Sequence, residues 1–418
     1  MGDILEKVNI FILVLSLIGL CRIFFVYFFT LVYDNKLIKL EYKYEKEHVQ
    51  FKPTITIVIP AFNEEKSIVR TLESVCSNTY ENKNVVVVDD GSLDNTFILT
   101  RKFIHDNPDA RVKVVRQKNG GKSVAINNAL FNYVDTDLVM VLDADSILKK
   151  DAIENMCKWF FNDNIIAMAM NVKMLNLPSF LGVAQRFEFI NAYRGKCAEH
   201  VLKTLYIIGG IGSTFRVSDL QSVGGYDINT QTEDIDLTLK LISKFGNAQK
   251  IFGYANDAIA YTEPVSSFKS LIKQRYRWKY GRFVAFSKYK SLFFNTDKKY
   301  SKLLTFLQLP FSLIQEVLML VEPYVFVYLI FIAVYFKDWY MLWIMATFVT
   351  VIVLLSLTNS KENLKSRLYL ALSAPFNMFL SYILTVVEYS SLLKSFFHLK
   401  TIFNYKKNNA NWEHVERL

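Results

Sequence analysis

Asp137-Leu-Val-Met-Val-Leu-Asp-Ala-Asp145 is the stretch that decides the fold. The five apolar residues inside it predict a short strand that is buried on both faces, as the strands of parallel sheets are. This strand ends at two carboxylates, Asp143 and Asp145, and open α/β sheets bind ligands at the carboxyl ends of their strands. Such a pair can hold a divalent ion, because Mg²⁺ and Mn²⁺ prefer carboxylate and phosphate oxygens. The alternative is that Asp145 and Ser146 cap a helix expected over residues 150–161.

Strands and helices alternate along the chain before this stretch. We expect strands at 54–59, 84–88 and 112–116, and helices at 67–77, 96–104 and about 122–133. The alternation predicts an α/β fold with a parallel-core sheet and right-handed crossovers, whose ligand lies at the carboxyl ends of the strands. A polar cluster follows each strand at that edge: Pro60-Ala-Phe-Asn-Glu-Glu65, Asp89-Asp-Gly-Ser-Leu-Asp94 and Asn119-Gly-Gly-Lys-Ser123.

The first two clusters offer ligand contacts. Asn63 and Glu64 lie where the first strand opens onto the crevice. Asp89 and Asp90 follow the second strand and can accept hydrogen bonds from a base or a ribose. The alternative for the second cluster is a turn with Gly91 at positive φ, and the two interpretations are compatible.

Two further motifs carry charges that suit binding and proton transfer. Lys122 follows two glycines that let the backbone approach a ligand, and its amine can bind a phosphate or an acidic neighbour. The alternative for this motif is a flexible surface loop. Thr232-Glu-Asp234 opens a helix expected over 235–244, where Thr232 can act as the cap. Asp234 is the candidate general base, because a carboxylate suits deprotonation of a hydroxyl group.

Gln274-Arg-Tyr-Arg-Trp278 lies in a basic amphipathic segment over residues 267–290. A guanidinium group can bind phosphate through two parallel hydrogen bonds, and Trp278 offers a flat face for a sugar or a base. The alternative is a helix on the membrane surface, and both interpretations can be true. The glycine-rich stretch 206–216 would let a polar ligand pack against backbone, although such turns are usually structural.

Composition divides the chain into a charged middle and two apolar ends. Of its 418 residues, 52% are apolar. Residues 9–33 form an apolar run interrupted by Arg22, and about 20 such residues span a bilayer. This run is too long for the core of a signal peptide and lacks a cleavage site, so we expect an anchor that is retained. The expected organisation is an anchor over 1–33, a charged linker over 34–52, a soluble domain over 53–290, membrane segments over 301–393 and a basic tail over 394–418.

The net charge of +10 comes largely from Lys and Arg residues beside the apolar runs. Juxtamembrane cations of this kind face the cytoplasm and meet anionic lipid. No nucleic-acid-binding motif accompanies them, so the expected partner is the lipid bilayer and not nucleic acid. The four cysteines are far apart and lack metal-ligand spacing, which indicates a reducing compartment.

The second apolar region predicts an interfacial helix at about 301–313 and spans at about 316–336, 340–357 and 368–391. Glu316 and Glu322 are polar groups at membrane depth, so we expect them to line a channel. The charge rule leads to a conflict here, because the loop 361–367 and the tail 394–418 are both basic although one crossing separates them. Either the last segment is re-entrant or the rule fails in this chain.

Six motifs occur in a fixed order: Pro60-Ala-Phe-Asn-Glu64, Asp89-Asp-Gly-Ser92, Gly121-Lys-Ser123, Asp143-Ala-Asp145, Thr232-Glu-Asp234 and Gln274-Arg-Tyr-Arg-Trp278. Together they resemble the membrane-embedded family 2 glycosyltransferases, the inverting synthases related to cellulose, chitin and hyaluronan synthases. The resemblance covers about residues 50–285 by motif. By length, layout and the closing Asn411-Trp-Glu-His-Val-Glu-Arg417, the chain is most similar to the bacterial poly-β-1,6-N-acetylglucosamine synthases. It implies a nucleotide-diphospho-sugar transferase (GT-A) domain flanked by transmembrane helices.

The resemblance also implies a role for each motif. Asp234 would be the catalytic base with Glu233 beside it, and Asp145 would bind Mg²⁺ or Mn²⁺. Gln274 and Trp278 would bind the acceptor. The donor would be bound by Ala61, Asn63, Glu64, Asp90, Lys122, Asp143, Arg275 and Arg277.

The sequence departs from the family pattern at two places. Gly121-Lys-Ser123 stands where Gly-Lys-Ala is usual, which is a mild change. The segment 212–215 differs from its counterparts in hyaluronan and cellulose synthases, which leaves the acceptor and the sugar open.

The function implied by the resemblance is inverting, metal-dependent transfer from a UDP-sugar, best guessed as UDP-N-acetylglucosamine, that extends an extracellular β-linked polysaccharide processively. The acceptor would be the growing glycan or a lipid-linked acceptor. The protein would be a multi-pass cell-membrane protein with a cytoplasmic catalytic domain and a small membrane subunit as a further partner. One alternative is a non-processive membrane glycosyltransferase that acts on a lipid or lipid-linked acceptor. Another is a transporter or scaffold that only binds nucleotide, against which the intact Asp145 and Asp234 argue.

Overall fold

The computed structural model describes residues 2–47, 51–175 and 179–397. Its centre is an eight-stranded mixed sheet with the strand order β3-β2-β1-β4-β7-β6-β8-β5. The first four strands in this order are parallel to one another: β3 (Val112–Arg116), β2 (Lys83–Asp89), β1 (Ile55–Ala61) and β4 (Leu138–Val141). The remaining strands are β7 (Ser213–Arg216), which is antiparallel to both of its neighbours, β6 (Ile165–Met174), β8 (Ile251–Thr262) and β5 (Ile147–Leu148). The predicted α/β fold with a parallel core is confirmed.

The register of the parallel half brings the polar strand ends to one edge. Ala61 of β1 lies opposite Asp89 of β2, and Asp89 lies opposite Arg116 of β3. Val141, the last residue of β4, pairs with Val58, so the chain after β4 runs past the same edge. β1 and β4 are buried along their whole length, as strands covered on both faces should be.

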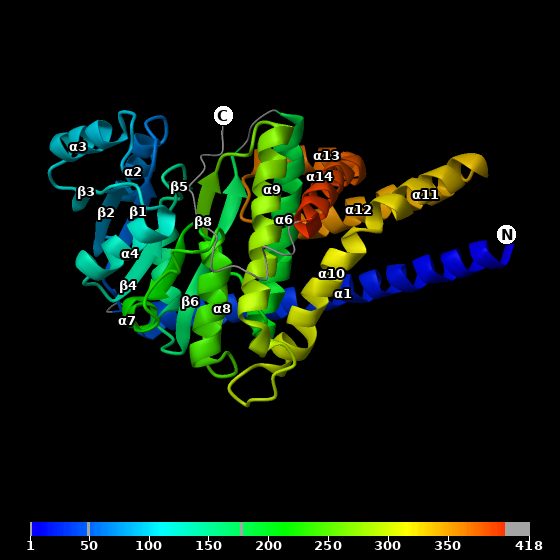
Figure 1. Cartoon of the computed structure of the whole chain (residues 1–418), viewed down its shortest axis with the longest axis horizontal. Coiled ribbons are helices and arrows are strands. Elements are labelled where there is room, and N and C mark those ends of the chain that lie inside the picture. Colours follow the sequence, from blue (N-terminus) through cyan, green and yellow to red (C-terminus); the bar gives the residue numbers. More distant parts are fainter. Residues whose placement is uncertain (1, 48–50, 176–178, 398–418) are drawn as a thin grey trace.

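Helices connect and cover the strands (Figure 1). Around the parallel half they are α2 (Ile68–Cys76), α3 (Thr96–Asp106), α4 (Lys122–Asn132) and α5 (Ala152–Trp159). The predicted cap at Asp145 and Ser146 is wrong, because β5 intervenes and Asp151 directly precedes α5. The second half adds α7 (Val217–Ser222), α8 (Glu233–Phe245) and α9 (Phe268–Lys288).

One long helix, α6 (Phe180–Leu202), was not predicted from the sequence. It packs against α1, β6 and β8 on one side and α14 on another. Gln185, Arg186 and Arg194 are buried within it among apolar residues. These polar residues on the packed face interrupt the apolar period that identifies an amphipathic helix.

The N-terminal helix α1 (Gly2–Glu47) continues through the residues for which a linker was expected. That expectation is wrong because Tyr33 and Leu37, four residues apart, are buried against the sheet domain. The Tyr33 hydroxyl donates to the carbonyl of Tyr254 at 2.7 Å, and Asp34 pairs with Arg194 at 3.2 Å. The anchor therefore runs into the domain as a continuous helix.

Three described helical segments are long and apolar enough to span a membrane: residues 17–46 of α1, α12 (Trp339–Leu357), and residues 364–397, which comprise α13 (Leu364–Ser373) and α14 (Asn377–Phe397). A fourth span is possible if the segment Leu303–Met319, which includes α10 (Leu309–Met319), and α11 (Glu322–Tyr335) form one broken helix with a bend of 52°. The break lies at 320–321, later than the predicted boundary near residue 314.

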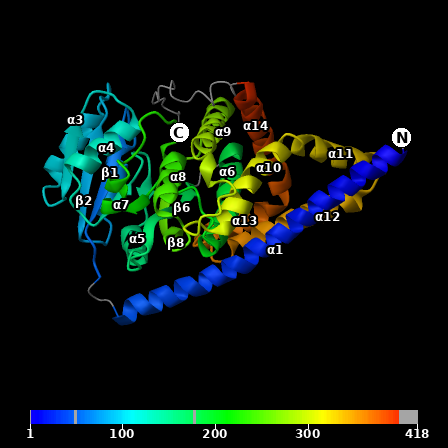
Figure 2. The same ribbon diagram turned by 60° about the horizontal axis from the view of Figure 1, so that its bottom comes forward.

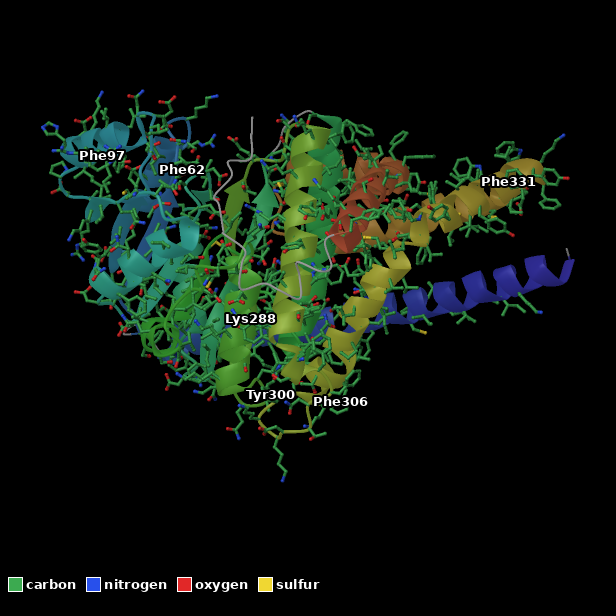
Figure 3. All side chains as sticks on the ribbon, in the orientation of Figure 1. Phe62, Phe97, Lys288, Tyr300, Phe306 and Phe331 are labelled. Carbon is green, nitrogen blue, oxygen red and sulfur yellow. The ribbon has the colours of Figure 1, made fainter. Side chains whose placement is uncertain are left out.

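The apolar helices point in two directions. The N-terminal part of α1, α11 and α12 project away from the sheet, whereas α13 and α14 stay beside α6 and α9 (Figures 1 and 2). Phe331 lies on the projecting arm, at the opposite end of the molecule from Phe62 and Phe97 (Figure 3).

Both ends of the segment from Ser360 to Lys394 contact the sheet domain, at β6 and at α9. At one end, Lys173 of β6 donates to the carbonyl of Ser360 at 2.6 Å and pairs with Glu362 at 2.9 Å. At the other end, the Lys394 amine lies 4.8 Å from the centre of the Tyr276 ring of α9. This arrangement favours the re-entrant alternative for the last apolar segment, because the loop and the start of the tail then lie on one side.

Cysteine labelling tests this arrangement. In a Cys21→Ser, Cys76→Ser background, which leaves the two buried cysteines, single added cysteines at Lys118, Lys361 and Lys394, all exposed, should react together with a membrane-impermeant thiol reagent in sealed vesicles of one orientation. Lys118 marks the side of the sheet domain. Labelling at 118 and 361 with protection at 394, released by detergent, would instead establish a full crossing.

Candidate active site

Lys122 joins three elements at the edge of the sheet. Its amine lies 2.8 Å from Asp143 Oδ1, which follows β4, and 2.7 Å from Glu233 Oε1, at the start of α8. Burial opposes the charged amine, but the two carboxylates outweigh burial and raise the pKa of Lys122. The structure thus brings together three residues that are far apart in the sequence. Gly210 lies against this cluster, since a Cβ there would be 3.3 Å from the Lys122 amine.

Asp90 shapes the loop that presents Lys122. Its carboxylate accepts hydrogen bonds from the backbone N–H groups of Gly120 at 3.0 Å and Gly121 at 2.8 Å, and from the Gln117 amide at 2.8 Å. Gly121 has a φ of 91°, a conformation that L side chains rarely adopt. The loop is therefore fixed by Asp90, and the alternative of a flexible surface loop is wrong.

Asp234 lies beside Glu233, and both residues line a cavity that Lys122 and Asp143 also line. Burial and the neighbouring Glu233 carboxylate raise the pKa of Asp234 to about 6, although Lys122 and Arg277 act in the opposite direction. The backbone N–H of Ile235 donates to Asp234 Oδ1 at 2.8 Å. A carboxylate that titrates near neutral pH is suited to accept a proton during a reaction.

The two carboxylates after β4 fit a divalent ion held jointly with a phosphate. Asp143 and Asp145 are both partly exposed at the sheet edge, and Ser146 Oγ donates to Asp145 Oδ1 at 3.3 Å. Within the described ranges, no group of three or more His, Cys, Asp or Glu side chains could hold a metal alone. Mg²⁺ commonly uses one or two carboxylates and completes its shell with substrate phosphates and water, so the donor set fits.

Helix α9 brings Gln274, Arg275, Arg277 and Trp278 to the cavity. The Nε atom of Arg277 is buried with no hydrogen-bond partner in the described structure, so its N–H can donate a hydrogen bond to a ligand. Arg275 is differently placed, because both of its terminal nitrogens donate to Glu188 at 2.7 Å. Its guanidinium carbon also lies 4.3 Å from the centre of the Trp278 ring.

A glycine lets α9 approach α8 closely. A Cβ added at Gly281 would lie only 2.2 Å from Thr232 Oγ1. Thr232 precedes α8, but its side chain makes no capping hydrogen bond. The predicted capping role of Thr232 is therefore wrong, and its side chain packs against α9 instead.

Ala61, Asn63, Glu64 and Asp90, which were expected to bind the donor, lie at the neighbouring ends of β1 and β2. Ala61 is fully buried, and Asn63 Oδ1 accepts from the backbone N–H of Leu93 at 2.9 Å. Glu64 Oε2 accepts from Ser67 Oγ at 2.6 Å. Gly91 has the positive φ of 77° that its turn requires. With Asp90, these side chains hold the strand-end loops together, and none of them is among the described residues that line the large cavity.

That cavity has a volume of about 810 Å³. One end is formed by Lys122, Asp143 and Asp234. The other end reaches the apolar helices, and its lining there includes Arg22, Ile23 and Val26 of α1, Ile352 and Ser356 of α12, and Glu388 of α14. Several buried polar atoms of the lining lack a partner in the described structure, namely Asn191 Oδ1, Thr232 Oγ1 and the Nε atoms of Arg194, Arg277 and Arg282. Such atoms indicate a polar ligand, because buried polar groups are normally hydrogen-bonded.

The sequence placed two carboxylates incorrectly and missed others. Glu316 is 2% exposed and pairs with Lys279 and Arg282; Glu322 is exposed. Neither is among the described residues that line the cavity, so the predicted channel lining by these two residues is wrong. The lining instead includes Glu188 and Glu199 of α6 and Glu388. α6 was missed, and Glu388 lacked a motif that would have identified it.

Comparisons with known proteins agree with this geometry. A family profile described as "Glycosyltransferase like family 2" matches residues 53–281. The chain is 32% identical over 229 residues to the poly-β-1,6-N-acetyl-D-glucosamine synthase of Staphylococcus aureus, covering 54% of each chain. It is 31% identical over 241 residues to the synthase of the same name from Staphylococcus epidermidis, covering 57% of this chain and 56% of that one. The match thus spans about half the length of these curated relatives.

A solved structure resembles the chain over most of its length. It is a mannosyltransferase from Pyrobaculum calidifontis in complex with GDP-Man and Mn²⁺, with a TM-score of 0.56 and 17% sequence identity. The similarity covers 91% of this chain and 99% of that chain. At this identity the comparison supports the fold, including the apolar helices that flank the sheet.

The contact between α9 and α8 can be tested by one methyl group. Gly281→Ala should push α9 away from Thr232 and separate Arg277 from Asp234, because overpacking typically costs about 1–3 kcal/mol. We expect a lower unfolding temperature and slower release of UDP from a UDP-sugar. Gly195→Ala is the control for stability, since a Cβ at that helical position meets nothing within 4 Å. Equal unfolding temperatures of the two variants would contradict the close contact.

Proposed function

This chain belongs to the glycosyltransferase-like family 2, and we propose that it transfers sugar from a UDP-sugar to a β-linked glycan that it extends processively. We propose UDP-N-acetylglucosamine as the donor, because the relatives at 31–32% identity are named for a polymer of that sugar. The single observation that carries the proposal is the large cavity, which runs from Lys122 and Asp234 to the apolar helices α1 and α12. A synthase that exports its product needs such a continuous path.

The donor's diphosphate would lie between Lys122 and Arg277. Both side chains line the cavity, and Arg277 carries a buried nitrogen without a partner in the described structure. Asp143 and Asp145 would hold Mg²⁺ or Mn²⁺ with the diphosphate, and the bound ion would offset negative charge on the leaving group. Asn63, Glu64 and Asp90 would support the uridine at the adjacent strand ends, where Asp90 also fixes the loop of Lys122.

Asp234 would act as the general base. It would remove the proton from the acceptor hydroxyl as that oxygen attacks the anomeric carbon on the face opposite the diphosphate. The bond to the leaving group breaks while the new glycosidic bond forms, so a single displacement turns an α-linked donor into a β-linked product. Lys122 and Arg277 would stabilise the negative charge that develops on the diphosphate. Glu233 would hold Lys122 in place, since the two groups are 2.7 Å apart.

The acceptor would lie on the other side of Asp234, against Gln274 and Trp278. From there the cavity continues toward Ile23, Val26 and Ile352 of the apolar helices, which supports export through or beside them. We propose a multi-pass cell-membrane protein with a cytoplasmic catalytic domain. UDP-sugars are cytoplasmic, and the exposed lysines near the apolar segments have the charge of cytoplasmic loops.

A pH profile tests the role of Asp234. Its pKa of about 6 means that the carboxyl group loses its proton as the pH rises through 6. We therefore expect kcat/KM to increase with pH up to about pH 6 and to level off at higher pH. Asp234→Asn should abolish this limb and lower the rate by about 10²–10⁴-fold, as loss of a general base typically does. UDP-sugar affinity, measured by calorimetry, should stay near that of the wild type. Asp109→Asn, on the surface, is the control, and a collapse of donor affinity in Asp234→Asn would make it a donor ligand.

Product length tests the function itself. Purified protein, with Mg²⁺ or Mn²⁺, should convert radiolabelled UDP-N-acetylglucosamine into long polymer, use other UDP-sugars poorly, and lose activity in excess chelator. Trp278→Ala should shorten the product more than it slows UDP release. The variant keeps Lys122 and Asp234, which would carry out the transfer, but it loses the indole ring against which the acceptor would lie. Single-sugar products from the wild type, with a lipid-linked acceptor and a small membrane subunit supplied, would favour the non-processive enzyme instead.

A further inference from the structure

One face of α9 carries three cations that all pair with carboxylates from other helices. Arg275, Lys279 and Arg282 are spaced four and three residues apart, which places them on one side of a helix. Arg275 pairs with Glu188 of α6 at 2.7 Å and with Glu388 of α14 at 3.4 Å. The remaining contacts are Lys279 with Glu388 and Glu316 of α10, each at 2.7 Å, and Arg282 with Glu316 at 2.5 Å. We call these six residues the α9 charge network.

The α9 charge network is balanced and has a buried centre. Arg275, Lys279 and Glu316 are each 5% exposed or less, whereas Glu188, Arg282 and Glu388 are partly exposed. Three cations face three carboxylates. A buried charge is tolerated only when its partner is present and the geometry is good. The network therefore constrains the position of α9 relative to α6, α10 and α14 more narrowly than apolar packing alone would.

Five of the six network residues line the cavity, namely Glu188, Arg275, Lys279, Arg282 and Glu388. Arg275 links the network to Trp278. Its guanidinium carbon lies 4.3 Å from the centre of the Trp278 ring, so the cation covers one face of the indole. Glu188 and Glu388 fix Arg275 from two sides. The position of Trp278 is thus set by a carboxylate on α14, two contacts away, and Trp278 and Glu388 both line the cavity.

We propose that Glu388 is a positioning residue for the acceptor: through Arg275 it holds the Trp278 ring at the acceptor end of the cavity, and so couples sugar addition to the placement of α14. This inference rests on the proposed function only in assigning Trp278 to the acceptor. Glu388 does not touch the donor-binding end, where Lys122 and Asp143 pair with each other. Loss of Glu388 should therefore impair acceptor binding and elongation while sparing donor turnover.

The test compares Glu388→Gln with Asp109→Asn. Asp109 is an exposed carboxylate that is not among the described residues lining the cavity, so it controls for the loss of one negative charge. For Glu388→Gln we expect a several-fold higher KM for an oligosaccharide acceptor, a several-fold shorter product and, at saturating acceptor, UDP release close to the wild-type rate. Asp109→Asn should match the wild type in all three measurements.

A spectroscopic measurement separates positioning from general destabilisation. The emission of Trp278 is obtained as the difference between each protein and the same protein carrying Trp278→Phe. Glu388→Gln should shift this emission, because Arg275 loses one of the groups that hold it against the indole, and Glu388→Asp, which keeps the charge, should restore it in part. If Glu388→Gln does not fold, Glu388→Asp alone should give an intermediate shift and an intermediate product length.

The outcomes separate the positioning role of Glu388 from the proposed processive synthesis. Unchanged Trp278 emission, equal loss of UDP release and elongation, or the same defects in Asp109→Asn would overturn the positioning role. Single-sugar products from the wild type would overturn processive synthesis, yet the acceptor KM and the Trp278 emission would still decide whether Glu388 positions the acceptor site.

Discussion

The salt bridges of Lys122 are the interaction on which the site depends. Three carboxylates, Asp143, Glu233 and Asp234, line the same cavity although they come from two parts of the chain, and like charges in one site repel one another. The Lys122 amine lies between Asp143 and Glu233, at 2.8 and 2.7 Å. It joins the end of β4 in the parallel half of the sheet to the start of α8 in the other half. The cluster can therefore form before any ligand arrives, and a second cation of the lining, Arg277 on α9, keeps a buried nitrogen without a partner in the described structure.

Several side chains for which a ligand contact was predicted make structural contacts near this cluster. Asp90 fixes the glycine loop, Asn63 fixes the turn after β2, and Thr232 receives the close approach of α9. Interpretations of such residues as structural or as ligand-binding therefore need not exclude each other. The same applies to Arg275, whose hydrogen bonds are used by Glu188 although its motif resembles one that binds donor and acceptor.

The sequence predicted those features that follow from local pattern. Apolar runs that end in Asp143 or Asp89 indicate buried strands, and parallel pairing then brings their ends to one edge. Helix α6 was not predicted because Arg186 and Arg194 interrupt its apolar face. Their partners, Ser366 and Asp34, lie more than a hundred residues away in the sequence. The continuation of α1 was not predicted because the two buried residues, Tyr33 and Leu37, are surrounded in the sequence by charged residues that hide the apolar pattern of a packed helix. The α9 charge network needs four helices to meet, which spacing along one chain does not specify.

The continuity of α1 has a consequence for the orientation of the sheet domain. At a rise of about 1.5 Å per residue, its 46 residues extend for roughly 70 Å, about twice the thickness of a hydrocarbon core. The same unbroken helix contains the apolar residues that are long enough to span a membrane and the residues Tyr33 and Leu37, which are buried against the sheet domain. An unbroken helix transmits tilt and rotation from one end to the other. In a bilayer that its apolar part spans, α1 would therefore fix the height and the rotation of the sheet domain.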